Sequence, residues 1–129
     1  MKTICVYCGS REGHESLYAE AAVALANEML NRKQVLVYGG ASGGLMGTLA
    51  DTMLEGNGQV KGIIPKAFVR RVAHRKLTDL QIVESMPERK VKMFQAADGF
   101  VALPGGFGTL EEVLEILMWA QLGMHSKPC

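Results

Sequence analysis

The stretch GFVALPGGFGTLEE, residues 99–112, joins an apolar run to a glycine-rich turn and then to the start of a helix pattern. A strand that turns through glycines into a helix points several unpaired backbone N–H groups at one place. Those amides and the helix dipole favour a bound anion, most often a phosphate. Glu111 and Glu112 follow in the expected first turn, where a plain phosphate site needs no negative charge. The stretch therefore predicts a phosphate site in which at least one carboxylate takes part in chemistry.

On either side of this stretch, short apolar runs alternate with segments of helical period, which is typical of a parallel sheet covered by helices. Strands are expected at residues 3–7, 34–38, 59–64, 80–83 and 99–103. Helices are expected at 16–32, 45–55, 85–97 and 109–122, with 66–78 as a loop or short helix. The helix at 85–97 begins with a capping box, Ser85 to Glu88. The pattern predicts the α/β class.

Composition excludes several classes of protein. The chain has 129 residues, 48% of them apolar, which suits one domain with a sizeable core. A net charge of +1 provides no broad positive surface, and we interpret the basic run at 70–76 as a solvated loop. No apolar stretch reaches the length of a membrane span, and residues 1–2 lead directly into a strand pattern. We expect no nucleic-acid partner and no membrane partner.

The cysteines indicate a reducing compartment. Cys5, Cys8 and Cys129 are an odd number of thiols, so reduced cysteines in a cytoplasmic protein are expected. Cys5 and Cys8 have C-x-x-C spacing, but in an extended run their side chains point to opposite faces. We therefore predict two core residues there. The histidines are far apart in the sequence, and no spacing predicts a metal site.

Two further glycine-rich turns follow expected strands, at residues 39–47 and at 8–10. In a doubly wound sheet all three turns lie at the carboxyl edge, where ligands bind. Glycines alone also serve tight strand-to-helix turns, but three such turns favour a nucleotide-sized ligand. No turn ends in the Gly-Lys-Ser/Thr of a Walker A loop, and Glu111 replaces the third glycine of a dinucleotide fingerprint. A single phosphate therefore fits better than NAD or a nucleoside triphosphate.

The charged residues near these turns have two interpretations each. Thr109 to Glu112 has capping-box spacing, so Glu112 alone is more often a cap than a catalyst. We expect Arg89 and Lys90 on the apolar side of their helix, where two cations near its N-terminus oppose the macrodipole. Long side chains also snorkel to water, but we favour contact with an anion or a carboxylate. Along the last helix we expect the following buried stripe: Leu110, Val113, Leu114, Leu117.

Together these residues resemble the LOG family of cytokinin riboside 5′-monophosphate phosphoribohydrolases. The family signature P-G-G-x-G-T-x-x-E matches residues 104–112 without a gap, and M-x-x-R-K matches Met86, Arg89 and Lys90. The resemblance covers essentially the whole chain. It implies a Rossmann-like, doubly wound parallel sheet in a single three-layer α/β/α domain. It also implies a homodimer whose pocket lies near the subunit interface.

The resemblance also implies the reaction, which is hydrolysis of a nucleoside 5′-monophosphate, AMP-like or N6-substituted, to free base and ribose 5-phosphate. Arg89 and Glu112 would form the catalytic pair. The carboxylate would stabilise an oxocarbenium-like state or orient water, and the arginine would hold it ionised. No metal and no cofactor is required. The implied substrate contacts are Ser10, Gly40, Gly43, Gly44, Lys90, Gly105, Gly106, Phe107, Gly108, Thr109 and Glu111.

The chain departs from the family pattern in two places. Pro87 stands where relatives commonly have histidine, and relatives continue past residues 127–128 with a further strand and helices. We therefore expect one nucleotide-binding domain over residues 1–129, shortened at its C-terminus. A non-catalytic nucleotide or cofactor carrier on the same scaffold is the alternative, since fold alone does not set activity. A lysine decarboxylase would need a lysine-bound pyridoxal phosphate site, for which the sequence offers no residues.

Overall fold

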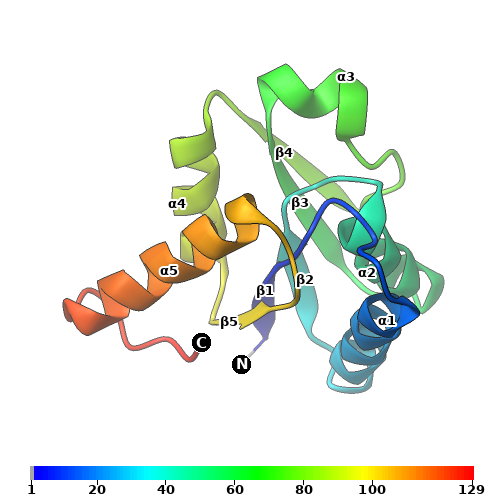
Figure 1. The fold of residues 1–129 in the computed structure, drawn as a ribbon, viewed down its shortest axis with the longest axis horizontal. Coiled ribbons are helices and arrows are strands. Elements are labelled where there is room, and N and C mark those ends of the chain that lie inside the picture. The colour runs from blue at the N-terminus through cyan, green and yellow to red at the C-terminus, as the bar shows by residue number, and fades with distance from the viewer. Residues whose placement is uncertain (1) are drawn as a thin grey trace.

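The computed structural model describes residues 2–129, which contain one five-stranded sheet (Figure 1). Its strands are β1 (Thr3–Tyr7), β2 (Val35–Tyr38), β3 (Val60–Pro65), β4 (Asp79–Val83) and β5 (Gly99–Ala102). The strands lie in the order β4-β3-β2-β1-β5, and every neighbouring pair is parallel. The chain therefore builds outward from β1 in one direction and then returns to place β5 on the other side of β1.

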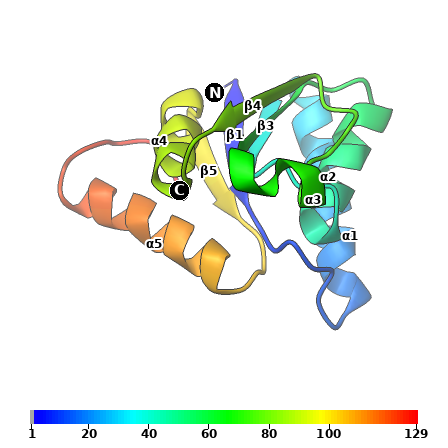
Figure 2. The same cartoon turned by 90° about the horizontal axis from the view of Figure 1, so that it is seen from above.

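Helices cover both faces of the sheet, as Figures 1 and 2 show. The longer ones are α1 (Ser16–Asn31), α2 (Gly44–Glu55), α4 (Met86–Ala96) and α5 (Phe107–Gln121). The segment between β3 and β4 forms a 3₁₀ turn, η1 (Lys66–Phe68), and a short helix, α3 (Val69–Val72). Helices α1 and α2 pack on one face, and α4 and α5 pack on the other. The prediction of a Rossmann-like, three-layer α/β/α domain is confirmed.

The core consists of two apolar clusters, one on each face of the sheet. The first joins Ala22, Met29 and Leu49 of α1 and α2 to alternate residues of β1, β2 and β3. The second joins Met93 of α4 and Ile116 of α5 to the opposite faces of the strands. Cys5 belongs to the second cluster and Cys8 to the first, so the C-x-x-C thiols do face opposite ways. Both are free, and burial raises the pKa of Cys8 to about 12.

The strand order brings the turn after β1 against the turn after β5. Residues Ile4 to Tyr7 pair in parallel register with Gly99 to Ala102. Beyond the strands, the N–H of Gly9 donates to the carbonyl of Pro104 at 3.1 Å. This is the place where the sheet reverses its direction of growth, and ligands bind there in open α/β sheets.

Helix boundaries follow the sequence well, with one exception that matters for function. Ser85 caps α4 as predicted, since its Oγ accepts the N–H of Glu88 at 3.2 Å. Helix α5 begins at Phe107, with Gly106 as its N-cap, two residues earlier than predicted. Glu112 therefore lies beyond the first turn and is not a capping residue.

The predicted buried stripe of α5 is wrong for three of its four residues, and only Val113 packs against the core. Leu110, Leu114 and Leu117 are 55%, 62% and 44% exposed, whereas the buried residues of α5 are Thr109, Glu112 and Ile116. The helix has apolar residues on two faces, and the structure buries the partly polar one against α4 and the sheet.

Within residues 2–129, no helix is long and apolar enough to cross a membrane.

Candidate active site

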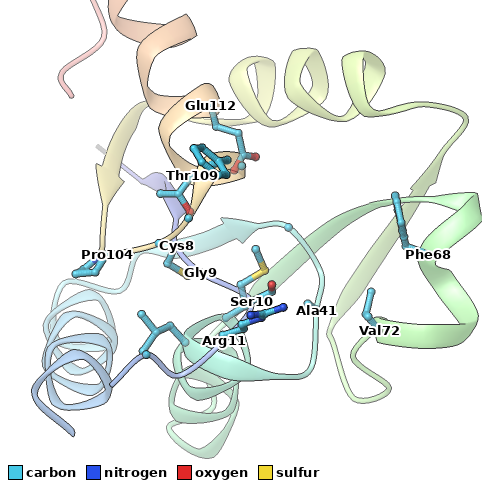
Figure 3. A pocket seen from close by; sticks show the side chains of 18 of the residues that line it. Cys8, Gly9, Ser10, Arg11, Ala41, Phe68, Val72, Pro104, Thr109 and Glu112 are labelled. Carbon is cyan, nitrogen blue, oxygen red and sulfur yellow. The ribbon is translucent and has the colours of Figure 1, made fainter. Parts of the chain in front are cut away.

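A cavity of about 780 Å³ opens at the carboxyl edge of the sheet, beside the turns that follow β1 and β5 (Figure 3). One side consists of the turn at 104–109 and the start of α5, and the opposite side of η1 and α3. Among the predicted site residues, those that line it are Ser10, Arg89, Gly105, Gly106, Phe107, Gly108, Thr109 and Glu112. The cavity volume suits a small ligand such as a nucleotide.

The start of α5 offers unpaired amides to this cavity. Its N-cap is a glycine, Gly106, which has no side chain to satisfy the first N–H groups. The N–H of Leu110 is the first to find a helical acceptor, the carbonyl of Gly106 at 3.1 Å. The amides of Phe107, Gly108 and Thr109 precede it and have no acceptor within the helix. With the helix dipole, they favour a bound anion at this point.

The glycines of this turn differ in what they do. At Gly105 a Cβ would lie 2.0 Å from Oγ1 of Thr109, so packing within the protein requires glycine there. At Gly106 and Gly108 a Cβ would meet no protein atom within 4 Å, and neither residue has a positive φ. Folding therefore does not demand glycine at those two positions. Close approach of a backbone to a ligand is a common reason for glycine at a position where the fold does not require it.

Arg89 of α4 and Glu112 of α5 meet at the wall of the cavity. Nη2 of Arg89 donates to Oε2 of Glu112 at 3.2 Å, and the residues are only 9% and 6% exposed. The expectation that Arg89 reaches a carboxylate is confirmed. Among the buried side-chain atoms of residues 2–129, Nε of Arg89 alone lacks a partner.

Two opposing effects act on the pKa of Glu112. Burial raises the pKa of Glu112 above its ordinary value, and the nearby Arg89 guanidinium offsets this only in part. As expected, the guanidinium favours the ionised carboxylate, but desolvation has the larger effect on the pKa. A carboxyl group with a raised pKa is better suited to accept and return a proton near neutral pH.

Lys90 and Glu111 do not line the cavity. The Nζ of Lys90 lies 2.5 Å from Oε1 of Glu111 and 3.1 Å from Oε2 of Glu115. The cation and the two carboxylates join α4 to α5 on the solvent side of the Arg89–Glu112 pair. The structure thus places these two predicted contacts beside the cavity and pairs them with each other.

The glycines after β2 shape a turn behind the cavity. Gly40 has a φ of +83°, and its added Cβ would lie 3.2 Å from Cβ of Ile64. Gly44 has a φ of +60°, and a Cβ there would lie 2.3 Å from the carbonyl carbon of Ser10. At Gly43 an added Cβ would have only the carbonyl oxygen of Ser10 within 4 Å, at 3.8 Å. None of these three lines the cavity, whereas Gly39 does.

Sequence reasoning did not predict the apolar wall. Phe68 and Val72 stand across the cavity from Thr109 and Glu112 (Figure 3). Their segment is tied to the rest of the protein through His74, whose N–H donates to the carbonyl of Gly40 at 2.8 Å. Arg11, which was not predicted either, also lines the cavity. No periodicity marks these residues, because they lie in turns or at helix ends that only the tertiary structure brings together.

The His74 side chain has its own partner. Its Nε2 lies 2.6 Å from Oδ1 of Asp51 on α2, and its Nδ1 accepts the N–H of Lys76 at 3.1 Å. The Nε2 of His74 therefore carries the proton and donates a hydrogen bond to the carboxylate. Elsewhere in residues 2–129, no group of three or more histidine, cysteine or acidic residues is placed to hold a metal ion.

Comparisons with known proteins place this architecture in a family. The sequence profile described as "Possible lysine decarboxylase" matches residues 46–129. A probable cytokinin riboside 5′-monophosphate phosphoribohydrolase of Oryza sativa subsp. japonica is 48% identical over 99% of this chain and 56% of its own length. A cytokinin riboside 5′-monophosphate phosphoribohydrolase of Arabidopsis thaliana is also 48% identical, over 98% of this chain and 59% of its own length. The chain thus spans a little over half the length of these curated relatives.

Solved structures confirm the fold at greater distance. The molybdenum cofactor binding protein of Rippkaea orientalis superposes with a TM-score of 0.77 at 22% identity, over 92% of this chain and 72% of that one. The Moco carrier protein of Chlamydomonas reinhardtii also gives 0.77, at 20% identity over 91% and 70%. At sequence identities this low, the similarity shows the fold alone. The profile match, the near-complete coverage at 48% identity and the signature residues agree, and the chain belongs to the LOG family.

Proposed function

We propose that this protein hydrolyses the N-glycosidic bond of a nucleoside 5′-monophosphate and releases the free base and ribose 5-phosphate. One observation carries the proposal. The buried Arg89–Glu112 pair and the unpaired amides of α5 border the same cavity. A substrate whose phosphate rests on the amides would extend its ribose toward the pair. The names of the relatives at 48% identity support the same reaction.

The chemistry follows from these groups. As the bond between C1′ and the base nitrogen breaks, its electrons go to the base, and positive charge develops on the ribose. The Glu112 carboxylate stabilises that charge and accepts a proton from the water whose oxygen bonds to C1′. The proton then passes to the departing base, so Glu112 returns to its first state. Arg89 holds the carboxylate in position through its Nη2.

The base would lie toward the apolar wall. Phe68 and Val72 are each 39% exposed and line the cavity across from the phosphate site. Apolar surface of this kind suits the flat face of a purine or an apolar substituent on it. We therefore propose AMP-like or N6-substituted adenine nucleotides as the substrate class.

The test is release of base from AMP and from isopentenyladenosine monophosphate by the purified chain, followed by chromatography. Glu112→Ala should lower turnover by about 10²- to 10³-fold, because it removes the charged group at the reacting carbon. Glu20→Ala is the matched control, since Glu20 is exposed on α1, away from the cavity. Unchanged turnover in the Glu112 variant would refute the mechanism. Retention of a phosphorylated ligand without base release would instead identify a carrier.

We also propose that the protein is a homodimer. The outward face of α5 carries large apolar side chains, with Phe107 at 92% exposure and Leu114 at 62%. Contiguous apolar surface of this kind marks an interaction site, and two-fold pairing of identical chains is the commonest assembly. Phe107 also lines the cavity, so a second copy on this face would border the site. Leu114→Glu should shift the mass measured by light scattering from dimer to monomer. A monomeric wild type would contradict the proposal.

The cysteines support a cytoplasmic location, which we also propose. Cys5, Cys8 and Cys129 are all free, and Cys129 is exposed. An exposed free thiol is suited to a reducing compartment. Cell fractionation with an antibody against the protein would test this.

A further inference from the structure

Lys90 occupies an unusual position next to the proposed catalytic arginine. Arg89 and Lys90 are consecutive on α4, yet Arg89 turns to the cavity and Lys90 turns to α5. The Lys90 ammonium contacts Glu111 at 2.5 Å and Glu115 at 3.1 Å, and its side chain is only 15% exposed. Figures 1 and 2 show that α4 and α5 lie on the same side of the sheet.

The acceptors on α5 have an informative spacing. Glu111 and Glu115 are one helical turn apart, so they lie on the same face and hold the ammonium between them. Glu112 follows Glu111 directly and points to the cavity, where it meets Arg89. Two adjacent cations on α4 thus meet different carboxylates on α5: one for the arginine and two for the lysine. The outer contact fixes how far α5 can slide along or turn about its axis relative to α4.

The inner pair cannot fix that alignment alone. It is held by one hydrogen bond of 3.2 Å, and Nε of Arg89 has no acceptor. Met93 and Ile116 anchor the two helices to the sheet, and Phe94 of α4 packs edge-on against Trp119 of α5. In and beside the cavity, however, the residues that face each other across the two helices are these charged ones. Because α5 also carries the phosphate amides, its alignment sets the distance between phosphate and carboxylate as well.

We infer that Lys90 is a positioning residue that holds α5 against α4 through Glu111 and Glu115, so that Glu112 faces Arg89 at the correct distance from the phosphate amides. The inference rests on the proposed hydrolase function. It assigns Lys90 a role other than the substrate contact implied by the family resemblance. The ammonium points to two carboxylates outside the cavity, and Lys90 is not among the residues that line it.

The direct electrostatic effects of these residues on Glu112 have opposite signs. The Lys90 cation lowers the pKa of Glu112, whereas the Glu111 carboxylate raises it. Removing Lys90 and removing its acceptors should therefore shift the charge state of Glu112 in opposite directions. Both changes nevertheless break the same contact between the helices. This difference separates a positioning role from a purely electrostatic one.

The experiment compares Lys90→Met with the double variant Glu111→Gln/Glu115→Gln in the full chain. We expect kcat for AMP to fall about 10- to 100-fold in both, because misplacement of reacting groups by about 1 Å has effects of that size. KM should stay within about twofold, and Lys90→Arg should recover most of kcat. Lys92→Met is the matched control, since Lys92 lies on α4 and makes no ion pair within residues 2–129.

A second measurement does not depend on turnover. The ¹⁵N resonances of the Arg89 guanidinium report its hydrogen bond to Glu112. Exchange of the guanidinium protons with water should speed up in Lys90→Met and in Glu111→Gln/Glu115→Gln, but not in Lys92→Met. If wild type releases no base while the Arg89 resonances respond in this way, the proposed function fails and the positioning role stands. If wild type is active and the two variants change kcat in opposite directions, or change neither kcat nor exchange, the positioning role is overturned.

Discussion

Replacing Gly108 by alanine should separate folding stability from ligand binding. Gly108 is the second residue of α5, and a Cβ there would meet no protein atom within 4 Å. Alanine loses less backbone entropy in a helix than glycine does, so the free energy of unfolding should rise by about 0.5–1 kcal/mol. For a domain of this size that corresponds to an increase of roughly 2–4 °C in Tm.

Binding should change in the opposite direction. The same methyl group would occupy the space in front of the α5 amides, where we propose the phosphate binds. Loss of one hydrogen bond to a charged group corresponds to about 1.5–3 kcal/mol, or a dissociation constant at least tenfold weaker. Isothermal titration with AMP or ribose 5-phosphate, together with thermal unfolding, measures both effects on one sample.

Gly105→Ala provides the contrast. Its Cβ would lie 2.0 Å from Oγ1 of Thr109 and 2.9 Å from the amide nitrogen of Gly9, so this variant should lose stability as well as affinity. A Gly108→Ala protein that is more stable and still binds AMP as tightly as wild type would refute the placement of the phosphate. A Gly108→Ala protein that is destabilised would refute our account of the turn.

Three other variants test single features. Glu112→Gln should make the free energy of unfolding less dependent on pH. Burial raises the folded pKa of Glu112, so its stabilising contribution is present below the unfolded pKa and is lost as pH rises through the folded one. Urea titrations between about pH 4 and 8 measure a difference of about 1.4 kcal/mol per pKa unit. Arg89→Lys keeps the charge but not the planar donors, and base release should fall at least tenfold. Asp51→Ala leaves the buried Nε2 of His74 unpaired and should lower unfolding free energy by about 1–3 kcal/mol, whereas Asp51→Asn keeps an acceptor and should cost less.

Local patterns in the sequence predicted the elements that local chemistry determines. Ser85 and Glu88 have the spacing of a cap, and they form one. The opposite facing of Cys5 and Cys8 follows from the period of a strand and needs no tertiary information. The meeting of Arg89 with a carboxylate was also predictable, because two cations at a helix N-terminus are unfavourable unless an anion compensates them.

What failed depends on long-range packing. Leu110, Leu114 and Leu117 have the spacing of a buried stripe, but periodicity does not say which of two apolar faces meets the sheet. The start of α5 was placed two residues late because Thr109 resembles a cap, whereas Gly106 serves as the N-cap. Phe68 and Val72 became part of the cavity through the turn at His74, a contact that no pattern in residues 66–78 indicates.

The pairing of β1 with β5 has a consequence for synthesis. The N–H of Gly9 bonds to the carbonyl of Pro104, so the two walls of the site come from opposite ends of the chain. Contacts so distant in sequence form slowly and late. On the ribosome, the nucleotide site that we propose would form only once α5 had emerged. Nucleotide retention by arrested nascent chains of increasing length would therefore rise in a single step.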